Sequence, residues 1–352
     1  MDDDCLSPRG HERGQVSAAD ENVMTIQKDV KRLIRERQAQ TGESYSRARQ
    51  HVMGERAALL APENAAGPTR HEAAVLKVNQ QSARVRVFGE DGEVTFRSTD
   101  IFDVVPGNVV TLAVDKRWTW HGDAYASGKV EDARIDIPRL GLTPLPLEGG
   151  QLEDLRKYSE PCRGNDAYSR LWRNLTAKPR PSYEFDEIAW GSFPGADPEE
   201  NPTCEAAELR ELGREQEARA LLMDTLGRDL RVLDAHAGLG NMEFDRSPKR
   251  AALHYEIGIR IGELSLPAGF DGLLPWARLY NRAFLRCLHG YGLCLWRQGD
   301  FTGAKSVFER ILTLNPNDNQ GVRFCWKDVR AGRSWEESQE EEENLDAGSE
   351  LH

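Results

Sequence analysis

The sequence predicts a multidomain α+β protein with an N-terminal helical hairpin, a small β-barrel and a C-terminal all-α array of helical repeats. Apolar residues recur at helical spacing near the N-terminus, alternate with polar residues over about residues 70–142, and return to helical spacing from residue 204. Eight of the 17 prolines lie between residues 144 and 202, where they separate the barrel from the array. A chain of 352 residues has room for about two or three such domains.

The formal net charge of −12 is concentrated at the two ends of the chain. Residues 1–23 carry six acids and two bases, and residues 335–352 carry eight acids and no Lys or Arg. Blocks of like charge with few apolar residues stay extended. We therefore expect a disordered acidic leader over 1–23, or upstream sequence if translation starts at Met24, and an acidic disordered tail over 335–352. The chain between these ends is formally neutral.

Residues 24–60 predict a basic helical hairpin. Apolar residues over 25–40 follow helical spacing, Thr41-Gly42 ends this helix, and Ser44 can cap a second one. Residues 24–56 hold eight bases and four acids. Two interpretations are open: the basic face contacts a nucleic-acid backbone, or it is a solvated face that docks on the body or dimerises, which we favour. The candidate nucleic-acid contacts on this face are Lys31, Arg32 and Arg35.

Residues 70–142 predict a compact barrel of the OB-like or SH3-like kind, with five or six strands. Apolar residues alternate over 74–78, 83–87 and 94–96, and the turn at 89–92 joins two of these segments. A second hairpin is expected around His121-Gly122-Asp123.

Trp118 and Trp120 share one face of a predicted strand, and Tyr125 lies opposite them across the turn. Aromatic side chains on a barrel face can stack unpaired bases, so both tryptophans are candidate nucleic-acid contacts. The alternative, which we favour, is that they close the barrel core or pack against a neighbouring domain, because residues 70–142 hold ten bases and eleven acids.

Residues 143–203 predict a proline-rich linker that is mostly irregular, with short helices near 151–158 and 166–175. The segment 182–195 is acidic and aromatic. We expect it to lie along the helical domain, anchored by four side chains: Tyr183, Phe185, Trp190 and Phe193.

Residues 204–334 predict stacked helix pairs. In residues 288–316, Gly292 and Ala304 allow two antiparallel helices to approach, Phe308 fills the space between them, and Pro316 ends the second helix. These residues resemble the tetratricopeptide repeat (TPR). That repeat has Trp, Leu-Gly and Tyr in its first helix, Ala and Phe in its second helix, and Pro after the second helix. The chain departs from that pattern at three places, occupied here by Leu288, Tyr291 and Leu295.

Weaker copies of the same pattern cover 204–230 and 234–255, so the resemblance spans about residues 204–330. An insertion over 262–279 is longer than the family allows. The resemblance implies a concave surface lined by the first helix of each pair, on which TPR proteins hold peptides or partner helices. Four residues fall on first helices away from the packing positions and are the candidate partner-binding residues: Asn241, Arg286, His289 and Leu293.

Arg286 and His289 stand three residues apart on one helix, so together they can meet a carboxylate. The alternative is a surface arginine beside a partly buried histidine. Cys287 and Cys294 fit small core residues better than metal ligands.

The sequence lacks the loop motifs of phosphate, zinc-protease, serine-hydrolase and calcium sites. We therefore expect no enzyme activity, no cofactor and no metal. The sequence also shows no signal peptide or membrane span, which predicts a cytoplasmic protein. The favoured function is a non-enzymatic adaptor that binds a segment of an unidentified protein or peptide on the concave face. The alternative is a nucleic-acid-associated factor that contacts RNA or DNA through the hairpin and the barrel.

Overall fold

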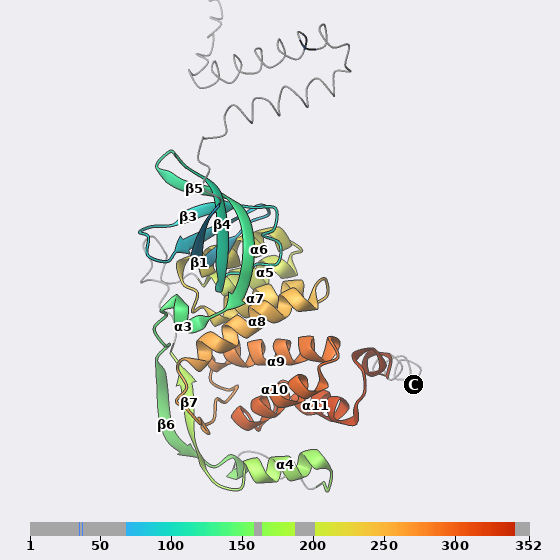
Figure 1. The fold of residues 1–352 in the computed structure, drawn as a ribbon. Helices are drawn as coiled ribbons and strands as arrows, with labels where there is room; N and C mark the ends of the chain where they lie inside the picture. The colour runs from blue at the N-terminus through green and yellow to red at the C-terminus, as the bar shows by residue number, and fades with distance from the viewer. Residues whose placement is uncertain (1–34, 36, 38–67, 158–163, 187–200, 342–352) are drawn as a thin grey trace, which may run out of the picture. The chain divides into compact units, whose positions relative to one another are not determined.

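The structure is a computed structural model that describes residues 35, 37, 68–157, 164–186 and 201–341. The chain divides into two compact units, Met1–Gly67 and Pro68–His352. The predicted basic hairpin lies outside the described residues, except for Arg35 and Arg37, which are helical, with Arg35 exposed. Lys31 and Arg32 lie outside the described residues as well. The second unit contains the predicted barrel and helices (Figure 1).

Five strands form a closed barrel in the order β1-β2-β3-β5-β4, which confirms the predicted α+β class with a small barrel. Strand β3 pairs in parallel with β5, and the other neighbours are antiparallel. The strands are β1 (Thr69–Val78), β2 (Ser82–Val87), β3 (Val94–Arg97), β4 (Asn108–Trp120) and β5 (Asp123–Ile135).

Alternation of apolar and polar residues explains the barrel core. In β2, Ala83, Val85 and Val87 are buried while the intervening arginines are exposed. Phe96 of β3 is fully buried in the same core. Because successive side chains of a strand point to opposite faces, this pattern turns one face of each strand into the barrel. The hairpin predicted at 121–123 joins β4 to β5.

The connection between barrel and array is more regular than the sequence predicts. After helix α3 (Ile137–Leu140), strand β6 (Leu147–Glu153) pairs antiparallel with β7 (Arg180–Phe185). Between them lie a short 3-10 helix, η1 (Leu155–Lys157), and α4 (Ala167–Leu175), which matches the helix expected at 166–175. The expectation of a mostly irregular linker is therefore wrong here.

The proline content of this segment wrongly predicts irregular structure, because β7 contains a proline, Pro181, without being interrupted by it. Pro181 has no N–H to donate, but its carbonyl accepts a hydrogen bond from Leu273 N at 2.7 Å. Two of the four predicted aromatic anchors also hold β7 on the array: Tyr183 packs on Phe270 of the α8–α9 connection, and Phe185 packs on Phe284 of α9. The other two, Trp190 and Phe193, lie outside the described residues.

In the described part of the chain, helices α5 to α11 follow β7, run from yellow to red in Figure 1 and precede the helical residues 335–341. They contact one another in chain order, and α7 also contacts α5 and α9. The helices are α5 (Pro202–Glu211), α6 (Glu215–Arg228), α7 (Leu233–Glu243), α8 (Pro248–Glu263), α9 (Asn281–Arg297), α10 (Phe301–Leu314) and α11 (Val322–Ala331).

The α9–α10 pair packs as its sequence predicts. A Cβ on Gly292 would stand 2.5 Å from Cε1 of Phe308, so only glycine lets that ring lie against α9. Ala304 and Phe308 are fully buried, and Gly299 makes the turn with a φ of 80°. This geometry supports the helix-pair interpretation of residues 288–316.

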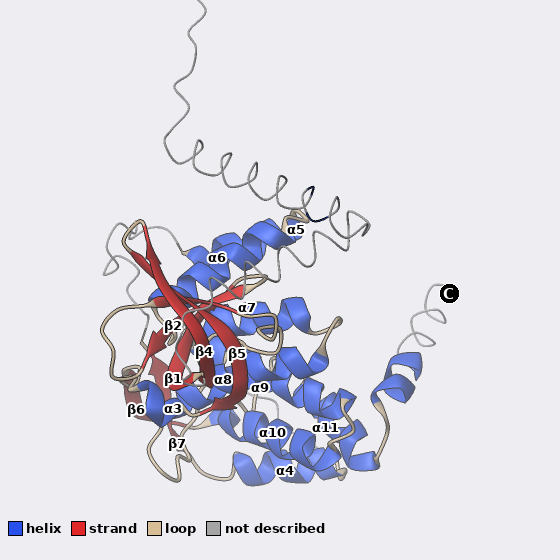
Figure 2. Cartoon of the chain, turned by 45° about the horizontal axis from the view of Figure 1, so that its top comes forward, coloured by secondary structure: helices blue, strands red, loops and turns tan. Residues whose placement is uncertain are grey.

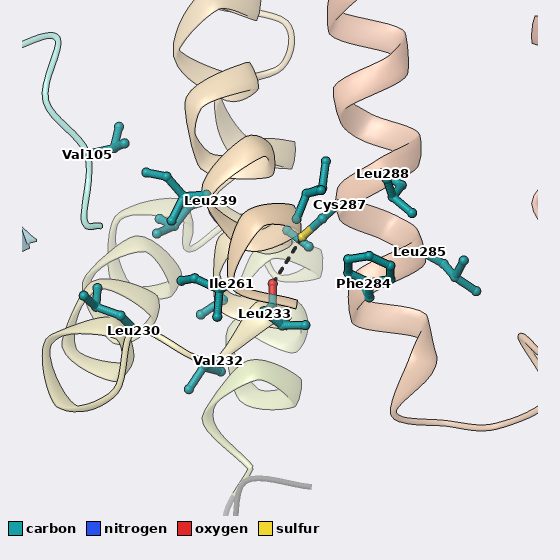
Figure 3. Packing of buried hydrophobic residues seen from close by; sticks show 14 of the residues in the cluster. Val105, Leu230, Val232, Leu233, Leu239, Ile261, Phe284, Leu285, Cys287 and Leu288 are labelled. Atoms are coloured by element: carbon teal, nitrogen blue, oxygen red, sulfur yellow. Dashed lines mark hydrogen bonds between the residues drawn. The ribbon is translucent and has the colours of Figure 1, made fainter. Parts of the chain in front are cut away.

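The barrel and the helices share one hydrophobic core. Figure 3 shows Val105, from the β3–β4 connection, across from Leu239 and Ile261 of the helices. Lys77 of β1 also pairs with Asp224 of α6. The β1 side of the barrel therefore packs on the array, and Figure 2 shows the red strands beside the blue helices.

The start of the predicted acidic tail is ordered. Residues 335–341 are helical, and the Trp335 ring meets the Trp296 ring edge-on with centroids 5.1 Å apart. The Nε1 of Trp296 donates to Arg333 O at 2.9 Å. One aromatic anchor thus overrides the charge repulsion that predicts disorder from residue 335, and residues 342–352 lie outside the described part.

None of the helices in the described part of the chain has the length and apolar content that crossing a bilayer requires.

Candidate functional site

Three cavities lie along the helices α5, α7 and α9, and we call this surface the α5–α7–α9 face. Their volumes are about 280, 240 and 160 Å³. Arg286 lines all three, Asn241 lines the first and third, and Asp234 lines the second and third. The cavities are therefore neighbouring parts of one surface, formed mainly by the first helices of successive pairs.

The first cavity brings together all four candidate partner-binding residues. Asn241 comes from α7, whereas Arg286, His289 and Leu293 come from successive turns of α9. Residues on α9 at spacings of three and four fall on one helix face, and this face turns toward α7. The sequence thus placed these four side chains on one surface of the fold.

Tyr255 of α8 forms the floor of this cavity. Its hydroxyl donates a hydrogen bond to Oδ1 of Asn241 at 2.6 Å. The ring fits only because two neighbouring positions are glycine: a Cβ on Gly240 or Gly290 would lie 2.5 Å or 2.3 Å from its nearest ring atom. Burial raises the pKa of the Tyr255 hydroxyl, so this group stays a neutral donor.

Arg286 already has a carboxylate partner within the chain. Its guanidinium pairs with Oδ1 of Asp234 at 2.9 Å and stands over the Trp276 ring at 5.6 Å. The Arg286 side chain is 43% exposed and that of Asp234 is 36% exposed. An exposed pair of this kind contributes little to stability, so a carboxylate from a partner can displace Asp234 at low cost.

His289 does not act as a second cation beside Arg286. Its Nε2 is buried without a hydrogen-bond partner among the described residues, and its ring meets the edge of Phe308. Burial lowers the pKa of His289 to about 4, so the ring is neutral at neutral pH. The geometry matches the alternative of a surface arginine beside a partly buried histidine.

The second cavity lies at the N-terminal ends of α5, α7 and α9 and is mainly apolar. Leu279 at its rim is 59% exposed, and Arg231, paired with Asp229 at 2.7 Å, stands at its polar side. The apolar lining consists of Leu145, Phe185, Val232, Leu233, Leu279 and Ala283. This cavity can accept an apolar side chain next to the exposed Arg286.

The third cavity adds a cation that the sequence did not single out. Arg210 of α5 is exposed, and no described carboxylate pairs with it. Asp234 and Tyr255 also escaped the sequence analysis. Arg210 and Asp234 share the first-helix position that identified Asn241, so that rule could have found them. Tyr255 lies on a second helix, and its ring reaches the face only through the space left by Gly240 and Gly290, which we call the glycine gap.

Cysteine and histidine clusters do not form a metal centre in the described part of the chain. Cys287 and Cys294 are fully buried in the helical core, as predicted, and burial raises the pKa of both thiols, that of Cys294 to about 12. His236 and His254 are also fully buried, and their pKa values are lowered by burial. These groups are packed inside the helices, away from the α5–α7–α9 face.

The barrel holds two further candidates, Trp118 and Trp120. Trp118 stacks on Tyr125 with centroids 5.5 Å apart and an interplanar angle of 11°. Trp120 is 54% exposed. Neither tryptophan belongs to the barrel core, so the expectation that they close it is wrong. Among the described residues, neither packs on the helical core either, which was the other part of the favoured expectation.

The sequence matches no protein-family model, and no curated protein is significantly similar to it. The resemblance to TPR proteins therefore rests on the residues and packing described above.

Proposed function

We propose that this protein is a non-enzymatic adaptor that holds a segment of a partner protein on the α5–α7–α9 face. The observation that supports the proposal is that Arg286 joins three neighbouring cavities into one surface, which also carries Asn241, His289 and Leu293. A continuous surface with apolar and polar parts suits an extended or helical segment better than a small molecule.

The chemistry of the face indicates the kind of segment. An apolar side chain fits the second cavity beside Leu279, and an acidic group beside it can replace Asp234 on Arg286. Arg210 offers a second cation that no described carboxylate occupies. The proposed ligand is therefore a segment with an apolar anchor followed or preceded by acidic residues.

Packing also supports the finer fold assignments that go with this function. We propose that the helices form a TPR-like array, because Gly292, Ala304 and Phe308 pack as the repeat requires. We propose that the barrel is OB-like, because five strands close in a Greek-key order with β3 parallel to β5.

Site-specific photo-crosslinking tests the proposal in cells. A photo-reactive amino acid in place of Leu293 reports on the α5–α7–α9 face, and one in place of the exposed Ser306 of α10 reports on a second helix. We expect a discrete protein crosslinked from position 293 and not from 306. The same set of products from both positions would contradict the assignment of the face.

Binding to the captured partner is then measured for variants of the full chain. Arg286→Glu should lower the affinity by about tenfold or more, since it replaces an attraction with a repulsion. Lys249→Glu makes the same charge change at an exposed position of α8 and should leave the affinity unchanged. Equal affinity of both variants and the unaltered protein would rule out the proposed role of Arg286.

A further inference from the structure

The outer face of the barrel carries a second arrangement of side chains, independent of the proposed adaptor function. Strand pairing places Arg84, Thr95, Tyr125 and Trp118 in one row across β2, β3, β5 and β4. Pairing places a second row beside it, made of Ser82, Arg97, Ser127 and Lys116. We call these rows, together with Trp120, the outer face.

A β-bulge at Asp115 creates this face. Val114 pairs with Gly128 while Lys116 pairs with Ser127, so β4 advances two residues where β5 advances one. Upstream of the bulge, Val114 points into the barrel core. Without the bulge, the same alternation would point Trp118 inward as well. The extra residue turns it to the outside, which is the kind of re-aiming that bulges produce.

Two cations of the outer face lie close to the Trp118 and Tyr125 rings. Arg97 stands 5.5 Å from the Tyr125 ring centroid and 5.9 Å from that of Trp118. Lys116 stands 5.9 Å from the Trp118 ring centroid. Trp120 lies beyond these rings, at the end of β4, and its ring centroid is 4.9 Å from the ring centroid of His121. The face therefore offers ordered aromatic planes next to positive charge.

Charge on the outer face is available to a ligand. Arg97 and Lys116 form no ion pair with any described carboxylate, and the same is true of Lys129, two residues beyond Ser127 on β5. Arg84 is paired with Glu93 at 3.3 Å. Asp123, opposite Trp120, is the acid nearest to the aromatic end in the strand register. The array packs on the β1 side of the barrel and leaves these cations exposed.

We propose that the outer face binds unpaired nucleotides of a single-stranded nucleic acid. Bases stack on aromatic planes, and their phosphates need cations that are not already neutralised. An acidic peptide would pair with Arg97 and Lys116 but would make no use of the tryptophan rings. An apolar peptide would have to remove water from both cations without replacing it. From Lys116 to Trp120 the strand extends roughly 13 Å, enough for a short run of nucleotides.

Fluorescence anisotropy with the full chain tests this proposal, with labelled single-stranded DNA and RNA of about 12 nucleotides. We expect binding of one or both at low salt, with affinity that falls as salt rises. The exposed Trp120 can be truncated without disturbing the core, so Trp120→Ala is the stacking variant. It should weaken binding by roughly 5-fold to 150-fold.

Charge variants separate the outer face from the rest of the chain. Lys116→Glu should weaken binding about tenfold and make the salt dependence shallower. Lys178→Glu is the matched control, because Lys178 is exposed in the α4–β7 connection, far along the chain from the barrel, and it should bind as the unaltered protein does. Thermal unfolding of each variant confirms that the fold is kept.

Four results would overturn the proposal. The first is no binding by the unaltered protein at low salt, and the second is equal binding by Trp120→Ala. The third is loss of binding only when Lys31, Arg32 and Arg35 are changed to Glu, which would assign the contact to the N-terminal segment. The fourth is equally tight binding of inorganic polyphosphate that Trp120→Ala leaves unchanged, which would make the face a general anion surface without a role for bases.

Discussion

Replacing Gly290 by alanine should destabilise the helical array, although alanine is the better helix former. A Cβ at this position would lie 2.3 Å from Cζ of Tyr255, against about 3.5–4.0 Å for a normal carbon contact. The ring cannot retreat freely, because it also lies against Gly240, where a Cβ would be 2.5 Å away. The ring must therefore leave the gap between α7 and α9.

The expected cost follows from three contributions. Overpacking costs about 1–3 kcal/mol, and loss of the hydrogen bond from Tyr255 to Asn241 costs about 0.5–1.5 kcal/mol. Alanine regains about 1 kcal/mol of helix propensity. The free energy of unfolding should therefore fall by roughly 0.5–3.5 kcal/mol.

Urea denaturation followed by circular dichroism measures this change. Gly227→Ala is the control, because its Cβ would meet only Lys77 Cβ at 3.7 Å, an ordinary contact. That variant should be unchanged or more stable by up to about 1 kcal/mol. If Gly290→Ala is as stable as Gly227→Ala, the position of the Tyr255 ring does not depend on the absence of a side chain at Gly290.

Three further predictions concern the same unit. Burial lowers the pKa of His236 from 6.5 to about 4, so the native state resists protonation and stability falls as the pH drops from about 6.5 toward 4. By pH 5 His236 alone should contribute about 2 kcal/mol to the loss relative to neutral pH, and the same pH slope of the urea midpoint in a His236→Gln variant would contradict this. Arg180→Met should lower the free energy of unfolding by about 3 kcal/mol, since the buried guanidinium donates to the carbonyls of Asp271, Gly272 and Thr313. Arg156→Met, at an exposed position, is the control in urea denaturation. Equal urea midpoints for the two variants would refute the prediction. Leu279→Asp should abolish the proposed partner binding on the α5–α7–α9 face without changing the unfolding midpoint, because Leu279 is 59% exposed at the rim of the apolar cavity. Full binding of the captured partner by this variant would exclude that cavity.

Much of the fold could be predicted because its signals are local. The alternation in β2 and the spacing of Gly292, Ala304 and Phe308 each describe one element or one helix pair, and the structure has them where the sequence puts them. The placement of Asn241 and Arg286 on one surface follows from the same rule, since both occupy first helices.

The rest of the candidate site depends on residues that meet across the chain. Arg286 pairs with Asp234, 52 residues away, and Tyr255 reaches Asn241 through a gap between two other helices. No local pattern contains such a pair, because each partner is a common exposed or buried residue of its own helix. The β6–β7 sheet was not predicted for the same reason. By itself, Pro181 indicates an interrupted strand, but in the fold its carbonyl accepts a hydrogen bond from Leu273 N.

The sequence by itself determined the type and order of the barrel strands and of helices α5 to α11, because hydrophobic periodicity and turn residues act within a few positions of the chain. Only the tertiary structure decided which way key side chains face. Trp118 and Trp120 lie outside the barrel because one extra residue at Asp115 shifts the hydrogen-bond register between β4 and β5. Register is a property of two paired strands, so a single strand's sequence does not specify it.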